Sequence, residues 1–191
     1  IRPTERVSDF IGGFKMEGDH VAPAYVPRKV SIVRSNETKR FDVKVRFPLR
    51  EPDRTAEDPV WRPLVDEFKQ IINRNRSTLL FANSRRLCEE LTLKINDGED
   101  HPVAYAHHGS LSREIRAEVE GRLKEGTLRA IVATNSLELG IDIGTLDEVV
   151  LIQSPPSVSS AIQRIGRSGH RVGEVSRSEI FPTPNQDLLE A

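Results

Sequence analysis

The sequence has 191 residues, which is enough for one full domain and a further segment. Apolar residues make up 37% of it and charged residues 30%, and 28 basic side chains are balanced by 29 acidic ones, so the net charge is −1. This composition excludes a chain that is disordered throughout and a basic tail that holds nucleic acid by charge alone. The sequence contains no apolar run of membrane-spanning or signal-peptide length, so we expect no membrane partner and a reducing, cytoplasmic setting.

The first fifty residues predict little that could fold alone. Residues 3–11 predict a short helix closed by two glycines, and strands are expected at 30–33 and 39–47. A helix and two short strands bury too little apolar surface for a core, so residues 1–50 are not expected to form an independent domain. Residues 51–60 are polar, charged and bounded by proline, which is typical of a linker between two bodies.

Residues 61–182 alternate helices and strands. Amphipathic spacing predicts helices that begin near residues 61, 84, 112 and 157, with Ile115 and Ile162 facing inward from the last two. Short apolar runs predict strands at 78–82, 103–106, 128–133 and 148–152. Nearly unbroken apolar strands between helices indicate a mostly parallel sheet covered on both faces, so we predict a three-layer α/β domain.

Polar loops follow three of the predicted strands. They are Asn83-Ser84-Arg85, His108-Gly109-Ser110 and Thr134-Asn135. In a parallel sheet, ligands gather at the carboxyl ends of the strands, where polar side chains and helix N-terminal amides can hold an anion. For any one loop alone, the alternative is that a serine caps the next helix and the arginines are simply solvated.

Residues 133–144 leave a buried strand and combine features of a nucleotide site. Gly140 and Gly144 allow positive φ and close approach of the backbone to a ligand. The hydroxyl of Thr134 can bond a phosphate, and a carboxylate a few residues later, Asp142, can accept hydrogen bonds from ribose hydroxyls.

Three arginines lie on and just after the last predicted helix. Arg164, Arg167 and Arg171 follow Gln163, with small residues between them. A guanidinium is always charged and forks onto phosphate oxygens, which suits charge that develops in phosphoryl transfer. The alternative, a solvated basic face, would not require the small residues. A second group of arginines lies at 73–86, a stretch without acidic residues.

Several chemistries have no sequence support. Cys88 lies between leucines on a predicted helix and is interpreted as a small core residue, not a nucleophile. The five histidines show no metal-binding spacing, so we predict no zinc site. The chain has neither a Gly-Lys-Ser/Thr loop nor an evident ligand set for Mg²⁺, so these residues alone are not expected to hydrolyse ATP.

These motifs resemble those of superfamily 2 helicases. The similar segments, in order and spacing, are residues 81–85, 108–112, 133–144 and 163–170, which resemble motifs IV to VI of the second RecA-like domain. The wording of the last two is closest to the Lhr (large helicase-related) family. The resemblance is strong over 77–182 and weaker over 1–50, which would then be the tail of the first RecA-like domain. It also implies that the chain is a fragment and that 183–191 lead to a further domain.

The resemblance assigns roles on the nucleotide side. It implies that Gly140 and Asp142 bind ATP, with Asp142 on the ribose, and that Gln163 and Arg167 face the γ-phosphate, Arg167 as an arginine finger. Arg164 would help to link motif VI to the partner domain. ATP and Mg²⁺ would be held mainly by the first RecA-like domain.

One position departs from the helicase pattern. His170 stands where many superfamily 2 helicases have a second arginine finger, so either this histidine takes a weaker role or neighbouring Arg171 reaches the nucleotide. The resemblance further implies that Thr134, Asn135 and the two preceding polar loops contact the backbone of single-stranded DNA or RNA.

The function implied by the resemblance is ATP-dependent helicase activity, with 3′ to 5′ movement on single strands, unwinding of DNA or RNA–DNA duplexes and a role in DNA repair. Two alternatives stay open. One is a DEAD-box-like protein that remodels RNA, and the other is a nucleic-acid-binding module without catalysis.

Overall fold

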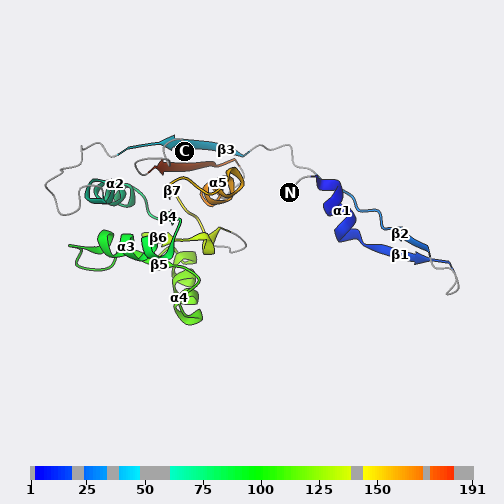
Figure 1. Cartoon of the computed structure of the whole chain (residues 1–191), viewed down its shortest axis with the longest axis horizontal. Coiled ribbons are helices and arrows are strands. Elements are labelled where there is room, and N and C mark those ends of the chain that lie inside the picture. The colour runs from blue at the N-terminus through cyan, green and yellow to red at the C-terminus, as the bar shows by residue number, and fades with distance from the viewer. Residues whose placement is uncertain are drawn as a thin grey trace. The chain divides into compact units, whose positions relative to one another are not determined.

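The computed structural model describes residues 3–18, 24–33, 39–47, 61–138, 144–169 and 173–182. The chain divides into two compact units between Thr38 and Lys39 (Figure 1). None of the helices in these described ranges is both long enough and apolar enough to cross a membrane.

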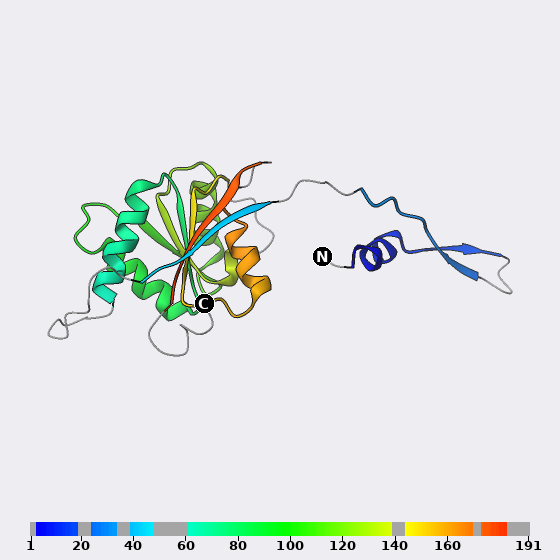
Figure 2. The same cartoon turned by 90° about the horizontal axis from the view of Figure 1, so that it is seen from above.

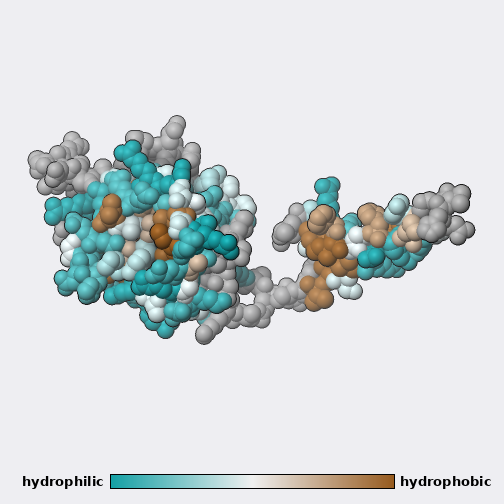
Figure 3. All heavy atoms as spheres, turned by 90° about the horizontal axis from the view of Figure 1, so that it is seen from below, coloured by the Kyte–Doolittle hydropathy of each residue, from teal (hydrophilic) through white to brown (hydrophobic). Residues whose placement is uncertain are grey.

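The smaller unit holds α1 (Thr4–Gly12), β1 (Phe14–Glu17) and β2 (Ala24–Pro27). The predicted helix is confirmed, and Gly13 with φ 58° ends it because its N–H turns back to a carbonyl of the last turn. The two strands pair antiparallel, which the sequence analysis missed, and residues 30–33 form no strand. Helix α1 buries none of its side chains, and apolar surface is prominent on this unit (Figure 3). These described residues therefore have no core of their own.

The larger unit is built on a six-stranded sheet in which all neighbouring strands are parallel (Figure 2). The strands are β3 (Arg40–Val45), β4 (Thr78–Ala82), β5 (Ala104–His107), β6 (Ala130–Ala133), β7 (Glu148–Ile152) and β8 (Val175–Phe181), in the order β3-β8-β7-β4-β6-β5. The helices are α2 (Trp61–Arg74), α3 (Arg85–Asn96), α4 (Arg113–Lys124) and α5 (Val158–Ile165), with a short 3₁₀ helix, η1 (Asn135–Leu137).

Helices cover both faces of this sheet, which confirms the predicted three-layer α/β architecture. In the inner strands, alternate residues enter two different cores, as for Leu80 and Phe81 of β4. One core packs α2 and α3 against the sheet, and the other packs α4, α5 and η1 against the opposite face. Cys88 of α3 is fully buried in the first core, as predicted. Burial raises the pKa of its thiol to about 11, so the thiol stays protonated at neutral pH.

Serine side chains begin three of the helices. Ser84, Ser112 and Ser157 each accept a hydrogen bond from the backbone N–H three residues later, at the start of α3, α4 and α5. Each hydroxyl satisfies a donor that the first turn of a helix leaves unpaired. The capping role weighed for the first two polar loops is therefore present.

Three expectations about the larger unit need correction. Strand β3 lies within the stretch 1–50 that the sequence analysis set apart, yet it pairs in register with β8 across more than 130 residues. Strand β8 was missed because its buried positions include serines and a glutamate, which hide its apolar character. Ile115 and Ile162 are 50% and 53% exposed, so they do not face the core.

Five side chains form a group that we call the ion-pair cluster: Arg46, Glu67, Arg74, Glu148 and Glu179. Glu179 of β8 accepts from both arginines, at 3.0 Å from Arg46 Nη1 and 2.9 Å from Arg74 Nη2. Arg74 also forks onto Glu148, and Arg46 reaches Glu67 at 3.2 Å. All three glutamates are buried, and the ion pairs compensate for the hydration that they lose. The pairs also connect α2 and the end of β3 to β7 and β8.

Candidate functional site

The polar loops after β4 and β5 lie against each other. The guanidinium of Arg85 donates to the hydroxyl of Ser110, which joins the start of α3 to the loop after β5. His108 Nε2 lies 3.0 Å from Glu89 Oε1 without forming a hydrogen bond, and the His108 ring is buried. The two loops that the sequence predicts to act together are therefore neighbours.

Four residues connect these loops to the helix α5, and we call them the motif cluster: Asn83, Glu138, Arg164 and Arg167. Arg164 is 3% exposed, its Nη1 donates to Asn83 Oδ1 at 3.0 Å, and its Nε donates to Glu138 Oε2 at 3.1 Å. Its guanidinium also lies 5.1 Å from the centre of the Phe81 ring. Asn83 uses its amide N–H₂ on the carbonyl of Ser154, 2.8 Å away.

The link to a partner domain that the resemblance implies for Arg164 stays a prediction. Within the larger unit, the Arg164 side chain is buried and binds Asn83 and Glu138. Asn83 is similarly engaged, because both ends of its amide have partners inside the unit.

Arg167 is held by a main-chain oxygen. Its Nε and Nη2 donate to the carbonyl of Glu138 at 3.2 and 2.7 Å, and the residue is 9% exposed. Burial lowers the pKa of the Arg167 guanidinium, and the carboxylate of Glu138 opposes that shift. These two hydrogen bonds to one carbonyl oxygen fix the direction of the guanidinium.

A second cation lies close to Arg167. Lys39 Nζ donates to the carbonyl of Gly166 at 2.7 Å. Burial, and then repulsion by Arg167, lowers the pKa of Lys39 below its ordinary value. Two cations beside one turn favour an anion in their vicinity.

His107 ties the end of β5 to the segment after β6. Its Nδ1 lies 2.8 Å from Ser136 Oγ and its Nε2 lies 2.9 Å from Glu120 Oε1. The N–H of Thr134 donates to the His107 carbonyl at 3.2 Å. Burial lowers the pKa of His107, although Glu120 raises it in part. A ring with its proton on Nε2 donates to the Glu120 carboxylate.

The predicted site residues fall into three groups. The exposed ones are Asn83, Ser84, Arg85, Gly109, Ser110, Asn135 and Gln163. The buried ones are His108, Thr134, Arg164 and Arg167. Gly140, Asp142, His170 and Arg171 lie outside the described residues.

The sequence analysis missed three residues of this region. They are Lys39, His107 and Glu138, each of which contacts a predicted site residue or the turn that carries it. A signal was present for Glu138, a carboxylate inside a motif whose neighbours in space are arginines. None was available for Lys39, because its contact spans 127 residues of sequence.

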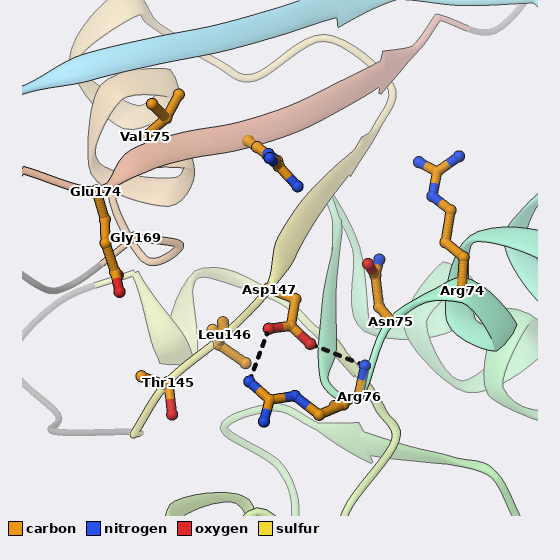
Figure 4. A pocket seen from close by; sticks show the side chains of 10 residues that line it. Arg74, Asn75, Arg76, Thr145, Leu146, Asp147, Gly169, Glu174 and Val175 are labelled. Carbon is orange, nitrogen blue, oxygen red and sulfur yellow. Dashed lines mark hydrogen bonds and ion pairs between the residues drawn. The ribbon is translucent and has the colours of Figure 1, made fainter.

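A hollow of about 670 Å³ opens at the opposite edge of the sheet, next to residues that precede β4, β7 and β8. Figure 4 shows Asp147 there, bridging the side chain and the main-chain N–H of Arg76. No predicted site residue within the described ranges lines this hollow. Those ranges also contain no group of three or more His, Cys, Asp or Glu side chains placed to hold a metal ion.

Residues 63–172 match the family described as helicase conserved C-terminal domain. The chain belongs to this family. The match covers the described residues of the motif cluster and of all the polar loops after β4, β5 and β6. The motif order that the sequence analysis found is therefore that of a helicase C-terminal domain.

The chain is also similar to proteins named Lhr helicases. ATP-dependent helicase Lhr-Core protein 2 of Thermococcus barophilus is 41% identical over 192 residues, which is 100% of this chain and 21% of that protein. A solved structure of Mycobacterium smegmatis helicase Lhr, bound to ssDNA and AMP-PNP, has a TM-score of 0.80 at 38% identity and covers 100% of this chain and 24% of that one.

More distant structures share the fold of the helicase domain. Dbp5 of S. cerevisiae has a TM-score of 0.63 at 21% identity, covering 79% of this chain and 37% of that one. Together with the six-stranded parallel sheet, these matches confirm the RecA-like fold. The chain spans about a fifth of the length of the curated relatives that it matches.

Proposed function

We propose that this domain is the second motor domain of an ATP-dependent helicase that moves 3′ to 5′ along single-stranded nucleic acid and unwinds DNA or RNA–DNA duplexes. The observation that carries the proposal is the contact of Arg167 with the Glu138 carbonyl, because it holds a charged guanidinium on the motif that follows the strand-end loops. The single-stranded DNA and AMP-PNP in the Lhr structure support the same assignment.

The residues present fit the γ-phosphate side of an ATP site. Arg167 is oriented by a neutral acceptor, and Gln163 is exposed one turn earlier on α5. When bound between two motor domains, ATP supplies the phosphoryl transfer that drives the cycle. Arg167 stabilises charge on that group, and Gln163 offers an amide to it. The described carboxylates do not form a Mg²⁺ site, so we assign the metal to the preceding domain, which we also propose to include residues 1–38.

In this proposal, the polar loops bind the nucleic acid. Arg85, Ser110 and Asn135 are exposed at the carboxyl edge of the sheet, and the first two contact each other. Hydroxyls, amides and guanidinium groups at this edge suit phosphate oxygens, which makes binding independent of sequence and weaker in salt. A role in DNA repair and a cytoplasmic location complete the proposal.

The alternative of a DEAD-box-like RNA remodeller has weaker support. Identity to the Lhr relatives reaches 41% over the whole chain, whereas identity to Dbp5 is 21%. An RNA remodeller would separate short RNA duplexes without directional movement.

The decisive experiment uses the full-length protein that contains this domain. ATP hydrolysis is measured with and without single-stranded DNA, and unwinding is followed on DNA, RNA–DNA and RNA duplexes with either a 3′ or a 5′ tail. We expect stimulated hydrolysis and unwinding of the 3′-tailed DNA or RNA–DNA duplexes. Unwinding restricted to RNA, or without dependence on tail polarity, would favour the remodeller. No stimulated hydrolysis would refute the helicase.

A further inference from the structure

Glu138 contacts both arginines of the motif cluster, by two different groups. Its carboxylate accepts from Arg164 Nε at 3.1 Å, and its main-chain carbonyl accepts from Arg167 Nε and Nη2 at 3.2 and 2.7 Å. The carboxylate side chain is 14% exposed and that of Arg164 is 4% exposed. A pair so shielded from water stays in one arrangement, because separating the partners would leave a buried charge without compensation for its lost hydration free energy.

The other side of Glu138 is connected to the strand-end loops. Its N–H donates to the carbonyl of Asn135 at 3.0 Å, at the end of η1. Within η1, Ser136 Oγ donates to the His107 carbonyl at 2.9 Å and contacts the His107 ring. A short, hydrogen-bonded helix therefore connects the Thr134–Asn135 loop to Glu138.

We propose that Glu138 is a positioning residue that transmits the state of the nucleic-acid loops to Arg167. The inference rests on the proposed function and deepens it by naming how one site regulates the other. The ion pair with Arg164 fixes the Glu138 peptide, and the carbonyl of that peptide aims the Arg167 guanidinium. Without the carboxylate, the Glu138 peptide loses one of its anchors, and its carbonyl aims the Arg167 guanidinium less well.

A mutant cycle in the full-length protein tests this mechanism. Glu138→Ala is made in the wild type and in Arg167→Ala, and kcat and KM for ATP are measured with saturating single-stranded DNA. In the wild type, we expect kcat to fall about tenfold, because misplaced catalytic groups cost one to two orders of magnitude. In Arg167→Ala, the same change is expected to alter kcat less than about twofold, since the group that it positions is gone.

The control variant is Glu67→Ala, which removes a carboxylate of similar burial that pairs with Arg46 outside the motif cluster. It is expected to lower the melting temperature and leave kcat unchanged. The affinity for single-stranded DNA, measured by anisotropy, is expected to stay within about threefold in every variant.

The outcomes separate this inference from the proposed function. A tenfold loss that disappears in the Arg167→Ala background supports the positioning role. Equal losses in both backgrounds, or no loss in either, overturn it while stimulated hydrolysis by the wild type upholds the helicase. A wild type without stimulation overturns both. If Glu138→Ala does not fold, Glu138→Gln, which keeps an oxygen for Arg164, replaces it in the same cycle with an expected loss of about threefold.

Discussion

The motif cluster and the ion-pair cluster hold their arginines in different ways: Arg164 and Arg167 are buried, whereas the side chain of Arg46 is 27% exposed and that of Arg74 is 45% exposed. In the ion-pair cluster, Arg46 and Arg74 meet three buried glutamates. In the motif cluster, Arg164 meets one carboxylate and a neutral amide, and Arg167 donates to a carbonyl oxygen. A carboxylate compensates the charge of a guanidinium, whereas a hydrogen bond to a carbonyl oxygen fixes the direction of the guanidinium.

Arginines that form structural ion pairs and arginines that can bind phosphate look alike in the sequence. Arg74 lies in a stretch without acidic residues, and yet its partners Glu148 and Glu179 are 74 and 105 residues away. The charges of the neighbouring residues in sequence therefore suggest that Arg74 is free to bind phosphate, although it forms structural ion pairs. The type of acceptor that each guanidinium contacts in the folded protein, and not the charge of its sequence neighbours, indicates which arginines can bind phosphate.

The largest stability effect is expected from Glu179→Ala. Two guanidinium groups lose a shared buried partner, so the free energy of unfolding of the domain should fall by about 3 kcal/mol. Urea denaturation followed by circular dichroism measures it. Glu99→Ala breaks an exposed pair with Lys69 and should cost less than about 1 kcal/mol. Equal losses in the two variants would show that the ion-pair cluster does not stabilise the fold.

A smaller effect is expected at Gly169, which follows Arg167 and leads toward β8. Its φ is +62°, and a Cβ there would lie 2.7 Å from the carbonyl oxygen of Val175. Gly126 has a similar φ of +72° with nothing near its Cβ position. Gly126→Ala should therefore cost about 1 kcal/mol from backbone strain, and Gly169→Ala about 2 kcal/mol because a clash is added.

Thermal unfolding of the two alanine variants isolates the clash, since the backbone strain is common to both. A Gly169→Ala protein as stable as Gly126→Ala would show that the turn after Arg167 can move away from β8. The turn would then not connect Arg167 of the motif cluster rigidly to β8, which carries Glu179 of the ion-pair cluster.

The smallest effect concerns acid. Burial lowers the pKa of His107 in the folded protein, so the unfolded chain binds more protons as the pH falls below about 6.5. Stability contributed by the neutral ring is complete above that pH and is lost on acidification. The free energy of unfolding should therefore decline between pH 7 and pH 5, and less steeply in His107→Asn. An identical slope in both proteins would contradict the burial of a neutral ring beside the motif cluster.

The sequence predicts the larger unit well where the signal is local. Strand β4 and the serine caps of α3 and α4 follow from neighbouring residues, and Cys88 is buried where its leucine neighbours indicate. It fails where partners are distant in the chain. Ser176 of β8 is compatible with a core because its Oγ donates to the Ser168 carbonyl at 2.7 Å.

The candidate site shows the same division. The motifs place Asn83 with the nucleic-acid loops and Arg164 and Arg167 on the nucleotide side, and in the structure these residues meet through Glu138 or by direct contact. Motif spacing does not predict which side chains use their hydrogen-bonding groups within the domain. That depends on burial and on acceptors such as the Glu138 carbonyl, which has no sequence signature.

The central claim, that carbonyl-held Arg167 serves phosphate while carboxylate-held arginines serve the fold, is tested most directly by turnover in the full-length protein. Arg167→Ala is compared with Arg76→Ala, whose exposed side chain pairs with Asp147 beside the hollow at the other edge. We predict that DNA-stimulated ATP hydrolysis falls by about two orders of magnitude or more in the first variant and is unchanged in the second, with single-strand binding retained in both. Undiminished hydrolysis by Arg167→Ala would contradict the account.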